Sequence, residues 1–228
     1  VISNISTPAS LSFLASVNVG WVCDIKIVRN RAYIVGKGVV PFGGILPGDA
    51  GLAIYNIANP ADPTLLGSIT HSDLINPSSV YLNGNYAYVA AHEYLFIFDI
   101  SESTDPSLAG KVYDATLLAS GYYVIVDGSY AYFVGAGDAF VIIDVSNPAN
   151  PSVVGSLAGN GSPNYMSVPS GLAKVGNYVY VCSYGEWRFN VVDVSTPSQP
   201  LMISYLDLSA TSRRPKQVIV RGKYAYVT

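Results

Sequence analysis

Charged side chains are scarce in this chain. Asp, Glu, Lys and Arg make up 12% of its 228 residues, about half of the roughly 25% usual in a globular protein. The net charge is −3, and the small basic group Arg213, Arg214 and Lys216 is expected to be a solvated loop. Because nucleic-acid binding depends on clustered positive charge, the composition argues against a nucleic-acid partner.

Cysteine and long apolar runs are also lacking. The two cysteines, Cys23 and Cys182, have neither the spacing of metal ligands nor the number needed for a disulfide framework. One long-range disulfide and two free buried thiols both remain open. Half of the residues are hydrophobic, but no apolar run approaches the roughly 18 residues that could cross a bilayer. We therefore expect buried strands and no membrane-spanning segment.

Sequence signatures of common enzymes are missing as well. The chain has no nucleophile elbow, phosphate loop or dinucleotide fingerprint. No segment combines a sustained helical period with helix caps. These absences favour an all-β protein without a recognisable catalytic motif.

What the chain does have is a repeat of about 45 residues, a period typical of arrays of one supersecondary unit. The segment Gly84–Val89 recurs as Gly128–Phe133, Gly176–Val181 and Gly222–Val227, with a degenerate copy at Asn30–Val35. A second block recurs between these copies, as Leu95–Ser101, Val141–Ser146 and Asn190–Ser195.

Each repeat reads as four strands joined by hairpins. In the third repeat the expected strands are Val124–Val126, Tyr130–Val134, Phe140–Val145 and Val153–Leu157. A single sheet of this size cannot bury both faces, but sheets stacked around an axis can, as in a β-propeller. We predict one domain over residues 1–228, a propeller of five four-stranded antiparallel blades.

Both ends of the chain fall inside a repeat. First strands are expected to begin near Asp24, Ser79, Tyr123, Gly171 and Gln217, and third strands near Val1, Leu52, Leu95, Phe140 and Phe189. We expect the ring to close through a last blade that combines Val218–Val227 with Val1–Ser16. An excerpt from a parent with six to eight blades would show the same pattern.

The motif Gly-x-Tyr-Ala-Tyr-Val, followed by Leu-x-Ile-x-Asp-Ile-Ser-x-Pro-x-x-Pro, resembles the LVIVD repeat over essentially the whole chain. The pattern is weaker at Asn4 and Asn56, which replace the aspartate, and at Ser103–Pro106. The resemblance implies a bacterial or archaeal propeller that is secreted or anchored at the cell surface. It transfers no catalytic residue.

The repeated residues themselves have structural explanations. Tyr86 and Tyr88 share one face of a strand, where their rings can fill the space between blades. Asp99, Asp144 and Asp193 precede Ser and a Pro-rich turn, so they are expected to accept local backbone hydrogen bonds.

Residues that differ between repeats are the better candidates for function. The residues that open each first strand should ring the mouth of the central channel: Cys23/Asp24, Ser78/Ser79, Tyr122/Tyr123, Ser170/Gly171 and Lys216/Gln217. Only Asp24 among them is acidic. Glycoside hydrolysis needs a pair of carboxylates, so we predict a protein that is not an enzyme.

Aromatic residues outside the repeat pattern gather on the same predicted face. With Asp24 they form the candidate binding face: Trp21, Phe42, Tyr94, Tyr122, Tyr123, Tyr165, Tyr184 and Trp187. Exposed aromatics are typical of recognition surfaces for proteins or sugars. The alternative is that several of them cap the apolar ends of blades.

Acidic residues in the turns between second and third strands form a candidate metal site. They are Asp49, Glu93, Asp138 and Glu186. Four acids on one rim could hold Ca²⁺, or they could remain solvated in ordinary turns. His71 and His92, near Asp73 and Glu93, could similarly bind zinc or be polar loop residues. No other cofactor is predicted.

These observations favour an extracellular or cell-surface binding propeller whose partner is a protein or a glycan. One alternative is a structural subunit of a surface layer or filament, which would self-assemble. A glycoside hydrolase is the other.

Overall fold

The computed structural model describes residues 1–4, 12–17, 20–37, 50–159, 161–211 and 213–228. In these ranges the chain forms twenty β-strands and one short 3-10 helix, η1 (Ser209–Thr211). No helix within them is long and apolar enough to cross a membrane. The predicted all-β class is confirmed.

Four sheets have four antiparallel strands each, joined in sequence order. Blade 1 contains β3 (Trp21–Val28), β4 (Arg31–Lys37), β5 (Ala50–Asn56) and β6 (Thr64–Thr70). Blade 2 contains β7 (Ser79–Asn83), β8 (Tyr86–Ala91), β9 (Tyr94–Asp99) and β10 (Ser107–Tyr113). Blade 3 contains β11 (Gly121–Asp127), β12 (Tyr130–Gly135), β13 (Ala139–Asp144) and β14 (Ser152–Ala158). Blade 4 contains β15 (Pro169–Val175), β16 (Tyr178–Ser183), β17 (Arg188–Asp193) and β18 (Leu201–Asp207).

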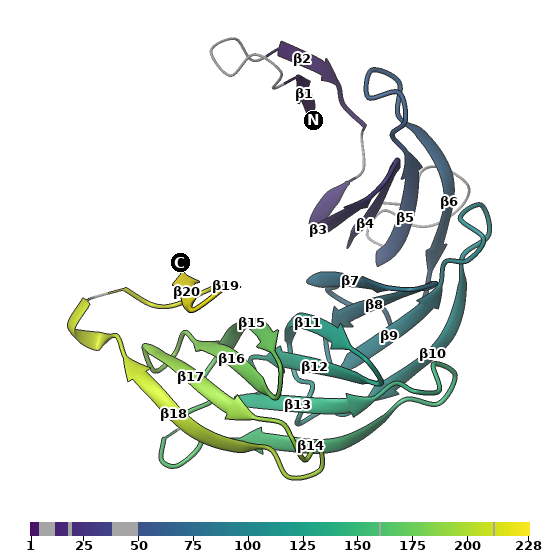
Figure 1. Cartoon of the computed structure of the whole chain (residues 1–228). Helices are drawn as coiled ribbons and strands as arrows, with labels where there is room; N and C mark the ends of the chain where they lie inside the picture. The colour runs from purple at the N-terminus through teal and green to yellow at the C-terminus, as the bar shows by residue number, and fades with distance from the viewer. Residues whose placement is uncertain (5–11, 18–19, 38–49, 160, 212) are drawn as a thin grey trace.

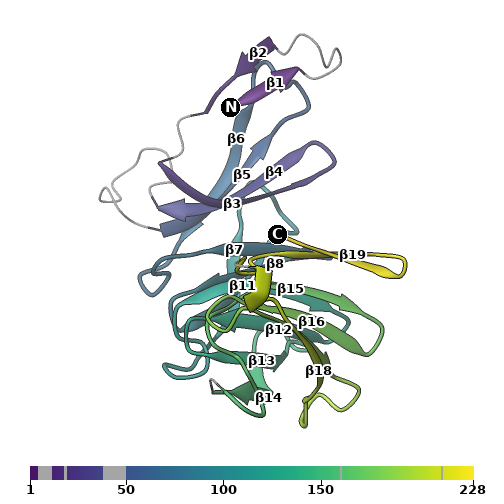
Figure 2. The same ribbon diagram turned by 90° about the vertical axis from the view of Figure 1, so that its left-hand side faces the viewer.

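The four blades fan around a common centre (Figure 1). Their first strands β3, β7, β11 and β15 lie innermost, and their fourth strands lie at the outer rim. Figure 2, turned by 90°, shows the blades stacked one after another with their hairpins projecting to either side. Neighbouring first strands contact each other directly, so the start of each blade faces the centre.

Apolar side chains from facing sheets form the core between blades. The third strands are buried on both faces: in β13 the run Ala139–Ile143 is fully buried, and Asp144 at the end of the strand is half-buried. Tyr88 and Ile97 of blade 2 pack with Val124 and Phe133 of blade 3 in one cluster. Burial of such area, at roughly 25 cal/mol per Å², makes blade stacking the main stabilising contribution.

The repeated aspartates serve the turn between third and fourth strands, as predicted. Oδ1 of Asp99, Asp144 and Asp193 accepts a hydrogen bond from the backbone N–H two residues on, at 2.8–2.9 Å. Asn56 makes the same bond to Ala58. Hydrogen bonds from the following serine hold the pKa of each aspartate below its usual value.

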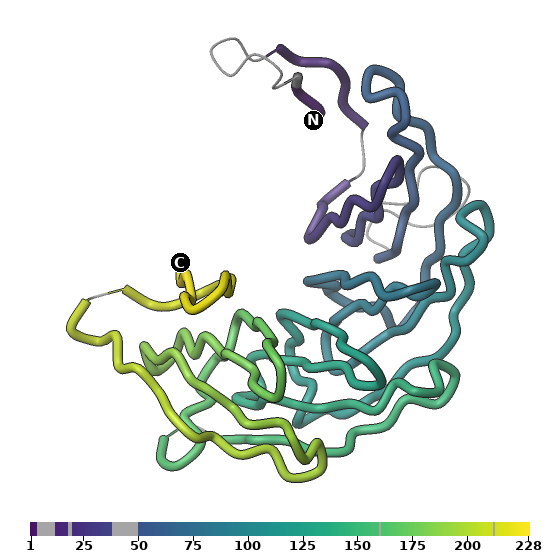
Figure 3. The backbone as a smooth tube through the Cα atoms, viewed as in Figure 1, coloured from purple at the N-terminus to yellow at the C-terminus, as the bar shows by residue number. Residues whose placement is uncertain are grey.

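The predicted closure of the ring is wrong for the described residues. β1 (Ile2–Asn4) pairs with β2 (Ser12–Ala15), and β19 (Val218–Arg221) pairs with β20 (Tyr224–Val227), as two separate sheets. The N- and C-termini lie on opposite sides of a wide gap (Figure 3). Paired strands must lie about 4.8 Å apart, and the arc of four blades does not turn far enough to bring β20 beside β1.

Candidate functional site

The inner ends of the blades converge on one cavity. Its volume is about 500 Å³. Its lining comes from the first strands of the four blades, from residues just before a first strand or before β19, and from Tyr184, which follows β16. The lining residues are Cys23, Asp24, Ser78, Ser79, Tyr122, Tyr123, Val168, Ser170, Tyr184, Lys216 and Gln217. This cavity, here called the channel mouth, brings together the residues that the repeat alignment placed there.

Small polar side chains of the channel mouth join blade 2 to blade 3, and blade 4 to the segment before β19. Ser78 Oγ donates to the carbonyl of Gly121 at 2.6 Å, and Ser170 Oγ donates to the carbonyl of Lys216 at 3.0 Å. Ser79 Oγ accepts from the N–H of Val124 at 3.1 Å. These bonds connect inner strands that share no sheet, so they fix the geometry of the rim.

Asp24 belongs to the same set of bonds between blades. Its Oδ2 accepts from the N–H of Val80 in blade 2 at 3.0 Å, and Lys26 Nζ lies 2.9 Å from the same oxygen. Oδ1 accepts from the N–H of Ile25 at 2.8 Å. Among the residues that line the channel mouth, Asp24 is the single carboxylate, and both of its oxygens are engaged.

Aromatic rings supply much of the remaining lining. Tyr122 and Tyr123 open β11 in blade 3, and Tyr184 follows β16 in blade 4. Tyr122 is exposed, whereas Tyr123 and Tyr184 are half-buried. Three tyrosines from two neighbouring blades therefore share one concave surface.

Two cations extend this aromatic surface. The guanidinium carbon of Arg214 lies 4.8 Å from the ring centre of Tyr184 and 4.7 Å from that of Trp187. Lys216 Nζ lies 5.6 Å from the ring centre of Tyr184. The sequence suggested only a solvated basic loop here, because nothing in it shows that residues 213–216 pass over blade 4.

The other aromatic candidates lie elsewhere. Trp21 begins β3 and is 76% exposed, but it does not line the channel mouth. Tyr94 packs against Phe96 and Tyr113 in blade 2, and Tyr165 stacks on Arg188, whose guanidinium carbon is 3.6 Å from its ring centre. Tyr94 and Tyr165 contact residues of third and fourth strands, which lie farther from the central axis than the first strands do. Phe42 lies outside the described residues.

The candidate metal ligands lie in separate hairpins. Asp138 Oδ1 accepts from the N–H of Val168 at 2.8 Å, and Glu186 Oε1 accepts from the N–H of Gly161. Glu93 lies 3.8 Å from Nδ1 of its neighbour His92. Within the described ranges, no three His, Cys, Asp or Glu side chains are grouped to hold a metal ion. Asp49 falls outside those ranges.

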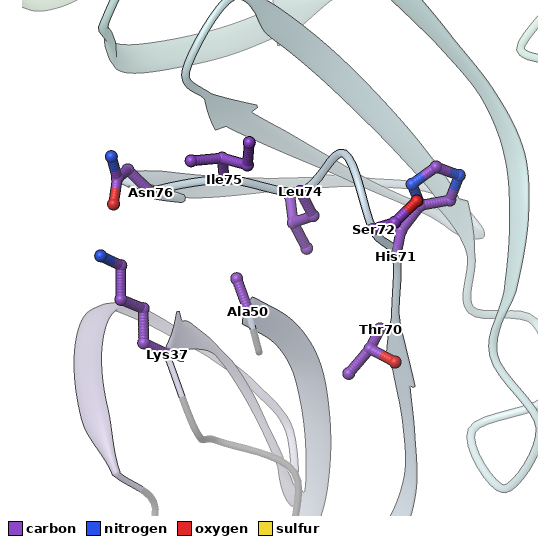
Figure 4. A pocket seen from close by; sticks show the side chains of 8 residues that line it. All are labelled: Lys37, Ala50, Thr70, His71, Ser72, Leu74, Ile75 and Asn76. Atoms are coloured by element: carbon purple, nitrogen blue, oxygen red, sulfur yellow. The ribbon is translucent and has the colours of Figure 1, made fainter. Parts of the chain in front are cut away.

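A second cavity of about 390 Å³ lies between blade 1 and the loop that leads to β7. Figure 4 shows Lys37 and Asn76 at one end and His71 at the other. Nδ1 of His71 accepts from the N–H of Asp73 at 3.0 Å, and Asp73 pairs with Lys111. At this end of the cavity, His71 Nδ1 is therefore already engaged by a backbone N–H.

Both cysteines are free thiols. Cys23 is exposed at the channel mouth, and Cys182 is buried in blade 4. Burial raises the pKa of Cys182 to about 12 and also raises that of Cys23. Of the two possibilities left open by the sequence, free thiols are present, although only one of them is buried.

Four-stranded blades around a central mouth define a β-propeller. The LVIVD repeat model matches residues 47–71, 76–114, 121–158, 170–207 and 212–228. The chain belongs to the LVIVD repeat family.

Solved structures share this fold at low sequence identity. A Lactobacillus plantarum protein is 14% identical with a TM-score of 0.68, and the match covers 90% of this chain and 62% of that one. A functionally unknown protein from Desulfotomaculum acetoxidans is 15% identical with a TM-score of 0.60, covering 81% and 55%. A Bacteroides fragilis protein, whose name provisionally assigns it as a 6-phosphogluconolactonase, is 14% identical with a TM-score of 0.68, covering 92% and 63%.

The chain thus spans less than two thirds of the length of each of these proteins. No curated protein matches it. Identities this low support the fold and nothing about activity.

Proposed function

We propose that this chain is a non-enzymatic binding propeller that acts outside the cytoplasm and recognises a protein or glycan at the channel mouth. The observation that carries the proposal is the meeting of Tyr122, Tyr123 and Tyr184 on one concave surface. Amphipathic rings held on a rigid scaffold are typical of recognition sites.

The backbone at Trp187 supports the same surface. Trp187 has a φ of 59°, in the left-handed region that bulky residues rarely adopt. The equivalent turn positions in blades 2 and 3 are Glu93 and Asp138, also with positive φ. A tryptophan at a position that suits small polar residues favours a functional role.

The chemistry of the channel mouth favours binding over hydrolysis. A glycosidase needs one carboxyl group as acid and another as nucleophile or base. Asp24, the single carboxylate of this lining, already accepts a hydrogen bond from the N–H of Val80 and forms an ion pair with Lys26. A location outside the cytoplasm is supported by the low content of charged residues and the repeat family.

The proposal is tested with a Tyr184→Ala/Trp187→Ala variant on a panel of immobilised bacterial polysaccharides and surface proteins. We expect binding to fall to background while the melting temperature falls by no more than about 5 °C, because both side chains are half-buried and neither belongs to the core clusters of blade 4. The matched control is Tyr178→Ala, because Tyr178 begins β16 and Tyr184 follows its other end. Unchanged binding by the double variant would exclude this face.

A structural role is the second candidate, and a separate observation favours it. Large apolar residues are exposed at both ends of the arc, including Ile27 in β3 and Leu201 and Leu206 in β18. Exposed apolar surface of this kind promotes association between copies.

A further inference from the structure

Positive charge collects on one side of the channel mouth. Arg214 and Lys216 come from the segment between η1 and β19, and both are exposed. Within the described part of the chain, neither side chain forms an ion pair with a carboxylate.

Negative charge at this site is already neutralised. Asp24 is bonded to Lys26 Nζ at 2.9 Å and to two backbone N–H groups. The charged side chains of this surface that form no ion pair in the described structure are therefore the cations Lys216, in the lining, and Arg214 beside it, although the whole chain carries a net charge of −3. Local fields of this kind attract ligands of opposite charge.

The cations are also held in place before any ligand arrives. Arg214 lies over the rings of both Tyr184 and Trp187, within 5 Å of each centre. Stacking on an aromatic face is attractive in itself and restricts the side chain. An ordered side chain loses less conformational entropy on binding, so its contribution to affinity is larger.

From these contacts we infer that the ligand at the channel mouth is an acidic sugar, one whose ring carries a carboxylate. This inference rests on the proposed function. The carboxylate of the sugar pairs with Arg214 and Lys216. The guanidinium of Arg214 can donate two parallel hydrogen bonds to the two oxygens of a carboxylate. The apolar C–H face of the sugar ring packs on Tyr122 or Tyr184, which line the channel mouth.

The size of the cavity favours a sugar over a protein surface. Its volume of about 500 Å³ lies within the range of about 300–1,000 Å³ typical of small-ligand sites. A protein partner would instead need a broad apolar patch with a polar rim. An acidic peptide is the competing ligand with the same charge, and the experiment separates the two.

The experiment measures binding of a galacturonate hexamer and a mannuronate hexamer by calorimetry, each beside its methyl-ester form and beside a glutamate hexapeptide. We expect at least one acidic hexamer to bind about tenfold more tightly than its ester, equivalent to about 1.4 kcal/mol. Raising the salt from 50 to 300 mM should reduce this preference, because the charges are exposed.

Substitutions test which residues cause the preference for the acidic hexamer over its ester. Arg214→Gln/Lys216→Met should abolish the difference between acid and ester, while Arg213→Gln, a neighbouring exposed cation with no ring contact in the described structure, should keep it. Tyr184→Ala should weaken both forms. Melting temperatures of all variants confirm that they are folded.

Three results overturn the inference. Equal binding of acid and ester, with both weakened by Tyr184→Ala, removes the charge requirement and leaves the proposed function standing. Binding of the glutamate peptide alone assigns the site to acidic peptides. Failure of every hexamer to bind excludes acidic sugars, and only failure on the wider panel as well would remove the proposed function.

Discussion

At the scale of single residues, Asp24 holds two blades together at their inner ends. Its carboxylate accepts a hydrogen bond from the N–H of Val80 in blade 2. Ser79 of blade 2 accepts one from the N–H of Val124 in blade 3 in the same way. Asp24 and Ser79 occupy the same place in their first strands, as the register of Ile25 with Ile34 and of Val80 with Val89 shows. These two polar residues of the rim therefore connect the blades, and the tyrosines and Lys216 of the lining are left for a ligand.

Replacing this carboxylate should destabilise the fold. Asp24→Ala leaves the N–H groups of Val80 and Ile25 without an acceptor, and we expect the free energy of unfolding to fall by about 1–3 kcal/mol. Asp24→Asn should cost less, because its amide oxygen can still accept. Urea denaturation measures both, with Asp62→Ala in an exposed turn as the control. Equal stability of Asp24→Ala and the parent would rule out this role.

At the scale of the blade, close approach of backbones sets how tightly neighbours pack. The position in the fourth strand that faces Ile54, Ile97 or Ile142 is a glycine in blades 1 to 3: Gly67, Gly110 and Gly155. A Cβ added there would overlap the backbone of the next blade's turn, at Ser103, Pro148 or Pro197. In blade 4 the same position is Ser204, opposite Val191, and it is exposed.

A single methyl group at this contact should separate blades 3 and 4. For Gly155→Ala we expect a loss of about 1–3 kcal/mol, the usual cost of overpacking, because the obstacle is the backbone oxygen of Pro197 and cannot rotate away. Ser204→Ala has no such neighbour and is the matched control. Thermal melts of both variants decide the matter, and an unchanged melting temperature for Gly155→Ala would show that the blades can shift without cost.

At the scale of the whole molecule, the arc ends in two incompletely covered faces. Tyr88 and Tyr132 are 3% exposed between blades, whereas Tyr226, their equivalent in β20, is 58% exposed. At the other end, Ile25 in β3 is 46% exposed, and its equivalent Val80 is 1% exposed. The same repeat position is thus core or surface according to whether a complete blade lies beside it.

These faces should make this 228-residue chain associate as its concentration rises. Light scattering should show a molar mass above 24.2 kDa at high concentration, since both apolar faces and unpaired strand edges promote contact. Leu201→Ser/Leu206→Ser/Tyr226→Ser should return the mass toward that of a monomer. Leu108→Ser, an exposed residue in β10 of blade 2 and so away from both ends, should not. A monomeric parent at every concentration would contradict this expectation and the structural-subunit alternative.

The strands could be predicted from the sequence because their signals are local. Every predicted first and third strand begins within three residues of the observed one, from Trp21 in β3 to Arg188 in β17. The hydrogen bonds of Asp99, Asp144 and Asp193 were predictable for the same reason, since each joins residues only two apart. The alternation of side chains along a strand and the residues that form a turn depend only on neighbours in the chain. Because the chain repeats, the same local pattern occurs several times and is easier to recognise.

The tertiary structure alone decided what depends on distance from the axis and on the angle between blades. It left the ring open, placed Tyr122 and Tyr184 at one cavity while Tyr94 packs in blade 2, and stacked Arg214 on Trp187. It also gave Asp24 its partner in the next blade. Each of these outcomes follows from packing between side chains far apart in the sequence, and no local pattern along a single repeat records how one blade meets the next.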